Sequence, residues 1–218
     1  MRIKIKGTHT QKEELKKRIS SDHELIEVKN NQFDDCDMII DLSFDEDWQN
    51  LNNYSTLENK VIVVGATRRQ LEKVVADFDE KIHCNLFGIN SLPTFVNRDL
   101  AEMTSLSKEE RSSIEPLFEA LNWPIKWVES RVGMVSPRVV CMIINEAYYT
   151  VQEGTASKED IDIGMKLGTA YPMGPFEWKE KIGIWNVYTL LEAIYEDTKD
   201  ERYKICPLLK TEYLSNFK

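Results

Sequence analysis

Two places in the first third of the chain carry residues that could bind phosphate groups. Gly7 follows the expected strand Arg2–Lys6 and precedes an expected helix. A glycine-rich turn at such a position lets the backbone approach the pyrophosphate of a dinucleotide. Arg68 and Arg69 stand near the start of another expected helix, where they could bind an anion. The alternative for these two arginines is a solvated surface pair.

The remainder of the turn departs from the dinucleotide pattern. After Gly7, the second and third glycine positions are occupied by His9 and Lys12. We expect His9 to obstruct a pyrophosphate and Lys12 to push the helix away from the strand. Glu27, at the end of the second expected strand, is the candidate for the acidic group that holds a ribose. The alternative for Gly7 is an ordinary turn glycine, and we favour it.

Metal chemistry is not indicated. The three histidines and four cysteines are dispersed, and no Cys-x-x-Cys spacing occurs. We therefore expect no metal site and reduced thiols, as is usual for cytosolic proteins.

The composition limits the classes of partner. Hydrophobic residues make up 42% of the chain, enough for a buried core, and the net charge is −9. An acidic surface repels nucleic-acid backbones and anionic lipid heads, so we expect neither partner. No run of about 18 apolar residues occurs, and Met1–Lys6 is typical of a strand rather than of a signal peptide. We expect a cytoplasmic protein.

Residues 1–130 alternate β-rich runs with helical stretches, which is typical of a parallel sheet covered on both faces. The expected strands are Arg2–Lys6, Glu24–Val28, Asp37–Leu42, Lys60–Val64, Cys84–Phe87 and Lys126–Glu129. The expected helices are Gln11–Ile19, Arg69–Phe78 and Lys108–Leu121. This pattern predicts a Rossmann-like, doubly wound α/β domain.

Residues 131–218 have the period of helices instead. Ser136 is the expected N-cap of a helix that Gly154 ends, and Ser157 is the expected start of a second helix that Gly168 ends. Two further helices are expected around Glu177–Ile182 and Trp185–Tyr195, and a short additional one could form near Leu208–Leu214. We predict an all-α C-terminal domain of about four helices.

The second half carries a specific resemblance. The run Ala156–Gly168, followed by Ala170–Glu177, resembles the C-terminal domain of 3-hydroxyacyl-CoA dehydrogenases. Asn145-Glu-Ala147, Glu153-Gly154 and Pro207-Leu-Leu209 continue the match. The resemblance implies an NAD-binding domain of Rossmann type, a helical domain through which subunits form a homodimer, and an acyl-CoA substrate. It also implies a shortened first domain, since only eight residues separate Val28 from Asp37.

The same resemblance locates the catalytic groups. The family's base is a histidine oriented by a glutamate, and these positions correspond to Asn90 and Glu102. An amide carries no proton at neutral pH, so the pair is broken. The family asparagine that positions the substrate corresponds to Pro137, whereas the arginine after it is retained as Arg138. A family serine corresponds approximately to Arg69.

Two interpretations follow. In the first, the chain is a catalytically impaired relative that binds an acyl-CoA-like or other anionic ligand, or a protein. In the second, it is a working oxidoreductase with an unusual mode of NAD binding, in which Glu102 or a water replaces the histidine. We favour the first, because the losses fall together on the cofactor turn, the base and a substrate-orienting amide.

Overall fold

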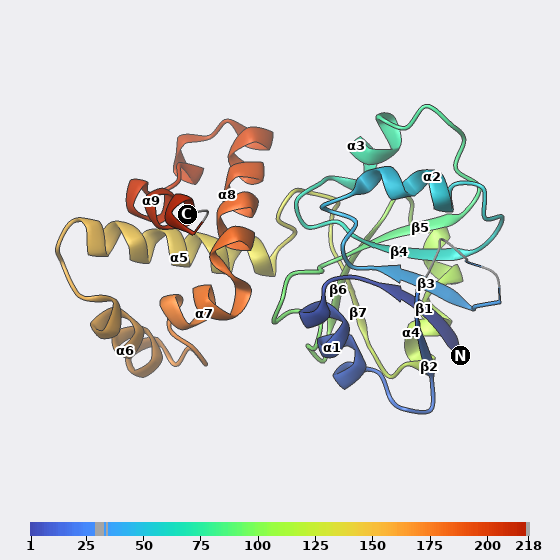
Figure 1. Ribbon diagram of the computed structural model, residues 1–218, viewed down its shortest axis with the longest axis horizontal. Coiled ribbons are helices and arrows are strands. Elements are labelled where there is room, and N and C mark those ends of the chain that lie inside the picture. The colour runs from blue at the N-terminus through green and yellow to red at the C-terminus, as the bar shows by residue number, and fades with distance from the viewer. Residues whose placement is uncertain (29–32, 34, 217–218) are drawn as a thin grey trace. The chain divides into compact units, whose positions relative to one another are not determined.

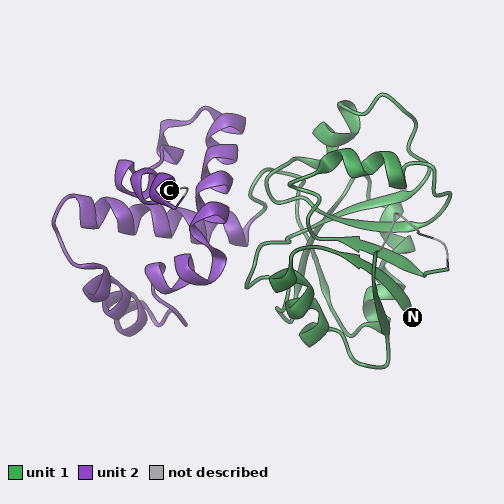
Figure 2. Cartoon of the chain, viewed as in Figure 1, with its two compact units in different colours: residues 1–134 green, residues 135–218 purple. Residues whose placement is uncertain are grey.

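The computed structural model describes residues 1–28, 33 and 35–216. It divides into two compact units, residues 1–134 and 135–218 (Figure 2). The connection between Val28 and Asp37, which the resemblance implies to be shortened, includes residues 29–32 and 34, which lie outside the described residues.

The first unit is built on a seven-stranded sheet with the order β2-β1-β3-β4-β5-β6-β7 (Figure 1). The strands are β1 (Arg2–Lys6), β2 (Glu24–Glu27), β3 (Met38–Asp41), β4 (Val61–Gly65), β5 (Asn85–Ile89), β6 (Ala101–Ser105) and β7 (Ile125–Trp127). The five strands β1–β5 are mutually parallel, and β6 pairs antiparallel with β5. The expected fold class is confirmed.

Helices cover both faces of the sheet. Neighbouring residues of a strand point to opposite faces, so an apolar strand contributes side chains to the core on each side. In β4, Val61 and Val63 pack on one face and Ile62 and Val64 on the other. The first face is covered by α1 (His9–Arg18) and α4 (Glu115–Ala120), and the second by α2 (Leu51–Tyr54) and α3 (Leu71–Ala76). The buried strands explain the continuous apolar runs of the sequence.

Strand β6 was not predicted. Its sequence, Ala-Glu-Met-Thr-Ser, contains three good helix formers and has no clear alternation, so local propensity does not reveal it. Pairing with β5 decides its conformation. The helix predicted over Lys108–Leu121 was also too long: the chain forms the 3₁₀ helix η2 (Glu109–Ser113) and then α4. A second 3₁₀ helix, η1 (Trp48–Asn50), precedes α2.

The second unit is helical. Its helices are α5 (Ser136–Gln152), α6 (Lys158–Thr169), α7 (Pro175–Ile182), α8 (Ile184–Thr198), the 3₁₀ helix η3 (Glu201–Tyr203) and α9 (Pro207–Ser215). Helix α5 packs against α6, α7, α8 and α9 and contributes the fully buried Ile144 and Tyr148 to the core. Asn145 of α5 donates to the carbonyl of Lys204 and accepts from the N–H of Cys206, which fixes the entry into α9.

Two predicted helix boundaries in this unit shift by one or two residues. Helix α5 begins at Ser136 itself, and Val135 is its N-cap. Helix α6 passes Gly168 and ends at Thr169, and its C-cap Ala170 takes the left-handed conformation at φ 55°. Ser157 caps α6 as predicted, accepting from the N–H of Asp160.

The turn before α7 depends on a side chain of α6. Asp162 accepts hydrogen bonds from the N–H groups of Phe176 (2.8 Å) and Glu177 (3.1 Å), the first turn of α7. A Cβ atom at Gly174 would overlap the Asp162 carboxylate. The glycine of the Tyr171–Pro175 turn is therefore required by the cap that joins the two helices.

Candidate functional site

The carboxyl ends of the parallel strands form the candidate site. Strand β1 lies between β2 and β3, so the chain leaves β1 to one side first and later returns to its other side. In open α/β sheets, ligands bind at such a switch point, outside the carboxyl ends of the strands. Here that position is the end of β1, the end of β3 and the loop that follows β5.

The side chain of Gln11, in the first turn of α1, lies at this switch point and is buried. Its Nε2 donates to the carbonyl oxygens of Leu42 (3.0 Å) and Ser91 (2.8 Å). Its Oε1 accepts from the N–H (2.8 Å) and the hydroxyl (3.0 Å) of Thr8. An amide side chain has two N–H groups and one carbonyl oxygen with two lone pairs, so all four positions are used. Gln11 thus joins the ends of β1 and β3 to the loop after β5.

Glycines make room for these contacts. A Cβ at Gly7 would lie 3.2 Å from both Gln11 Oε1 and Leu42 Cβ. A Cβ at Gly65, the last residue of β4, would overlap the Ser91 hydroxyl group and lie 2.8 Å from the carbonyl oxygen of Leu42. The space that a side chain at either glycine would need is therefore taken by Gln11, Leu42 and Ser91.

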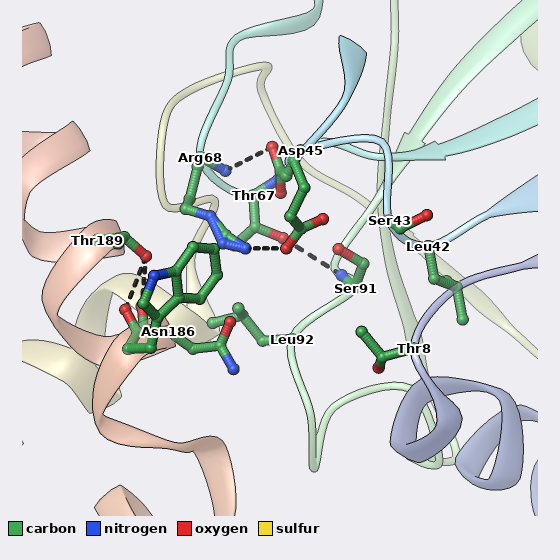
Figure 3. A network of polar contacts seen from close by, with 12 residues as sticks. Thr8, Leu42, Ser43, Asp45, Thr67, Arg68, Ser91, Leu92, Asn186 and Thr189 are labelled. Carbon is green, nitrogen blue, oxygen red and sulfur yellow. Dashed lines mark hydrogen bonds and ion pairs between the residues drawn. The ribbon is translucent and has the colours of Figure 1, made fainter. Parts of the chain in front are cut away.

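The same polar network continues along the strand ends (Figure 3). The hydroxyl of Thr67, after β4, accepts from the N–H of Ser91 at 3.2 Å. The carboxylate of Asp45, after β3, accepts from the N–H groups of Thr67 (2.7 Å) and Arg68 (3.0 Å). Burial raises the pKa of Asp45 to about 6, although Arg68 and the two N–H groups oppose the shift. We refer to Thr8, Gln11, Leu42, Asp45, Thr67 and Ser91 as the strand-end network.

Glu27, the candidate ribose ligand, lies at the end of β2 and already has cationic partners. Lys12 Nζ is 2.6 Å from one carboxylate oxygen and Lys16 Nζ is 3.7 Å from the other. The hydrogen bond from Lys12 lowers the pKa of Glu27. Lys12 occupies the third glycine position of the turn, so the residue that replaces this glycine also engages the acidic group.

Asn90 and Glu102 are brought side by side. Asn90 follows β5, Glu102 lies in β6, and the N–H of Asn90 donates to the Glu102 carbonyl at 3.0 Å across the antiparallel pair. Asn90 is buried, and its Oδ1 accepts from the N–H of Leu92 at 3.3 Å. The fold therefore juxtaposes the two positions that the resemblance assigns to the base and its orienting carboxylate.

The two arginines after β4 contact side chains of the first unit. Arg68 donates to the carboxylate of Glu46 at 2.5 Å, and the guanidinium carbon of Arg69 lies 5.8 Å from the ring centre of Trp48. These contacts do not gather the pair around a common anion position. Their role in binding a substrate stays a prediction.

Pro137 and Arg138 lie in the first turn of α5, in the second unit. Pro137 is buried, and Arg138 Nη1 donates to the hydroxyl of Tyr203 at 3.0 Å. The guanidinium carbon of Arg138 also lies 5.4 Å from the Tyr203 ring centre. Within this unit, Arg138 therefore connects α5 to η3, and its predicted role toward a substrate is untested.

Sequence reasoning missed Gln11, Asp45 and Ser91. A signal for the first was present, because Thr8 and Gln11 have the spacing of a capping box, and both hydrogen bonds of that box form. The expected helix start at Gln11 concealed it, since α1 begins at His9. No local pattern identifies Asp45 or Ser91, whose partners come from other strands.

Two general features of the described residues concern metal ions and membranes. Among the described residues, no group of three or more histidine, cysteine or carboxylate side chains is placed to hold a metal ion. Within the same part of the chain, no helix is long and apolar enough to cross a membrane.

Comparison with known proteins finds a family match for the C-terminal part of the chain. Residues 133–216 match the model of the 3-hydroxyacyl-CoA dehydrogenase C-terminal domain. A 3-hydroxyadipyl-CoA dehydrogenase of Escherichia coli is 45% identical over 78 residues, which are 36% of this chain and 16% of that protein. A probable 3-hydroxybutyryl-CoA dehydrogenase of Bacillus subtilis is 34% identical over 122 residues, 56% of this chain and 42% of that protein. The chain thus spans less than half the length of these two relatives.

A solved structure extends the likeness to the whole fold. The (S)-3-hydroxybutyryl-CoA dehydrogenase of Ralstonia eutropha superposes with a TM-score of 0.77 at 19% identity, covering 99% of this chain and 94% of that one. At this identity the match concerns the fold alone. The family model and the curated relatives therefore identify residues 133–216 as similar to the C-terminal domain of 3-hydroxyacyl-CoA dehydrogenases, and the solved structure shows that the chain shares the fold of such an enzyme.

Proposed function

We propose that this chain is a 3-hydroxyacyl-CoA dehydrogenase-like protein that has lost hydride transfer and acts by binding an acyl-CoA-like ligand. The observation that carries the proposal is Asn90, which lies beside Glu102 where the family resemblance places a histidine base. Oxidation of a hydroxyl requires a base that takes the hydroxyl proton as the hydride leaves. The carboxamide of Asn90 has no basic nitrogen at neutral pH, so the proton has no acceptor at this position.

The contacts around Gly7 support the proposal independently. Glu27 is already paired with Lys12 and Lys16, and the space beside Gly7 is occupied by Gln11. These residues do not fit a dinucleotide bound in the family manner, which requires an open glycine turn and an acidic group available to the ribose.

The test is thermal stability of the purified protein with NAD, NADH, acetoacetyl-CoA and CoA, each alone and in pairs. A ligand at about a hundred times its dissociation constant adds about 2.7 kcal/mol to the free energy of unfolding. We expect no shift with NAD or NADH and an upward shift with acetoacetyl-CoA. A shift with NADH that acetoacetyl-CoA strengthens would contradict the loss of hydride transfer. A flat response to all four compounds would contradict the acyl-CoA ligand and direct the search to protein partners.

Turnover provides the second measurement. We expect no acetoacetyl-CoA-dependent oxidation of NADH above the protein-free rate, followed by the absorbance of NADH. The Glu102→Gln variant is the matched control, because a residual reaction that uses this carboxylate as a base would fall in the variant. Measurable turnover that Glu102→Gln abolishes would establish an oxidoreductase with an atypical site.

A further inference from the structure

We propose that the side chain of Gln11 acts as an internal ligand of the switch-point crevice, holding the strand ends together and excluding a dinucleotide. This inference rests on the proposed loss of NAD binding and names the residue responsible for it. The crevice lies at the carboxyl ends of β1 and β3, with the loop after β5 beside them, and the Gln11 carboxamide hydrogen-bonds to all three segments.

The hydrogen bonds of Gln11 leave no polar group of the carboxamide free. Both Nε2 protons go to carbonyl oxygens, of Leu42 and Ser91, and Oε1 receives two hydrogen bonds from Thr8. Gln11 is 5% exposed and Ser91 is 2% exposed. Removing a buried partner leaves a carbonyl or N–H group desolvated without a hydrogen bond, which is unfavourable. Four hydrogen bonds to three residues therefore fix the side chain in the crevice.

A dinucleotide would compete for the same groups. In a Rossmann turn, the N–H groups after β1 bind the pyrophosphate, and the glycines provide the space for it. Here the N–H of Thr8 donates to Gln11, and the Gln11 Oε1 atom lies where it limits any side chain at Gly7. Binding a pyrophosphate in this turn would require Gln11 to leave the crevice. The carboxamide thus accepts the hydrogen bond of the turn that a cofactor phosphate would otherwise accept.

The experiment compares NADH binding by the unmodified protein and three variants, followed by NADH fluorescence. Gln11→Ala removes the carboxamide. His9→Gly removes the other side chain expected to obstruct the turn but keeps Gln11, so it is the matched control. The third variant combines both changes. We expect NADH affinity to rise by roughly tenfold or more in the double variant, which removes both obstructing side chains, and to stay unchanged in His9→Gly, where Gln11 still occupies the turn.

A folded double variant that binds NADH no better than the unmodified protein would overturn the role of Gln11 and leave the proposed function standing. Tight NADH binding by the unmodified protein would overturn both. A measurement on the unmodified protein covers the case in which the Gln11 variants do not fold. There, the side-chain amide protons of Gln11 should exchange with solvent far more slowly than those of the exposed Asn52 in an NMR experiment, and equal rates would overturn the proposal.

Discussion

At the scale of single residues, two carboxylates have pKa values shifted in opposite directions. Asp45, in the strand-end network, is buried, and its pKa rises to about 6. For Glu212 of α9, burial alone would raise the pKa, but hydrogen bonds from Lys158 and Lys179 outweigh burial and lower it to about 2. The two groups therefore stabilise the fold in opposite pH ranges.

The Asp45→Asn substitution tests the first shift. A carboxyl whose folded pKa is raised stabilises the fold below its unfolded pKa, and this contribution is lost as pH rises through the folded pKa. From the usual value of 3.8 to about 6, the difference corresponds to about 3 kcal/mol. We expect the free energy of unfolding of the unmodified protein, measured in urea, to fall relative to Asp45→Asn between pH 4 and pH 6. The exposed Asp22→Asn is the control, and parallel curves for all three proteins would contradict the shift.

The Glu212→Gln substitution tests the second shift. Glu212 pairs with Lys158 at 2.8 Å and with Lys179 at 2.9 Å, and the Lys179 side chain is only 8% exposed. Loss of the carboxylate leaves a buried ammonium with one fewer partner, so we expect a destabilisation of about 3 kcal/mol at pH 7. Because the folded pKa is lowered, the difference should persist above pH 4.5 and diminish as pH falls toward 2.

The control for Glu212→Gln is Glu196→Gln, which breaks the exposed pair between Glu196 of α8 and Lys199, the C-cap of that helix. We expect that change to alter the free energy of unfolding by less than about 1 kcal/mol. Equal effects of the two substitutions in urea unfolding would show that Glu212 is no more important than a surface charge.

At the scale of elements, the cap that joins α6 to α7 explains a glycine of the family-like motif. The Gly174→Ala substitution places a methyl group against the Asp162 carboxylate, which caps the first turn of α7. The carboxylate must move and its hydrogen bonds weaken, so we expect a loss of about 2 kcal/mol.

The matched change is Gly164→Ala in α6, where the added methyl group meets open space. Alanine has the higher helix propensity, so this variant should gain about 0.5–1 kcal/mol. Thermal unfolding of both variants measures the contrast. If Gly174→Ala were as stable as the unmodified protein, the requirement for glycine before α7 would be wrong.

At the scale of the whole molecule, the homodimer stays a proposal, and α6 offers a surface for it. None of the residues of α6 is buried within the chain, and Ile163 and Leu167, one turn apart, are 52% and 84% exposed. Exposed apolar side chains on one helix face are typical of interfaces. We therefore place the contact with a second copy of the chain on this face.

The double substitution Ile163→Asp with Leu167→Asp should convert the protein to a monomer, measured as the mass in light scattering after gel filtration. Because both side chains are exposed, the thermal stability of the monomer unit should fall only through loss of the partner. Glu196→Gln, an exposed change in α8 rather than on this face of α6, is the control and should keep the dimer mass. A dimer that survives the double substitution would place the contact elsewhere.

The sequence by itself determined the division into an α/β part and a helical part, the positions of most strands and the family resemblance. These features depend on period, propensity and short motifs, which act between residues that are close along the chain. Val61–Val64 is an example, since a continuous apolar run indicates a strand covered on both faces without knowledge of its neighbours.

Tertiary structure decided the features that depend on distant partners. Strand β6 forms because β5 offers it an edge, against its own local propensity. Gln11 donates hydrogen bonds to carbonyl groups 31 and 80 positions away in the sequence. Burial raises the pKa of Asp45, which follows β3 and is covered by the loop that follows β4. Spacing predicted only that the turn after β1 lacks two glycines. That a glutamine fills the crevice follows from packing, because desolvation obliges every buried polar group to find a partner.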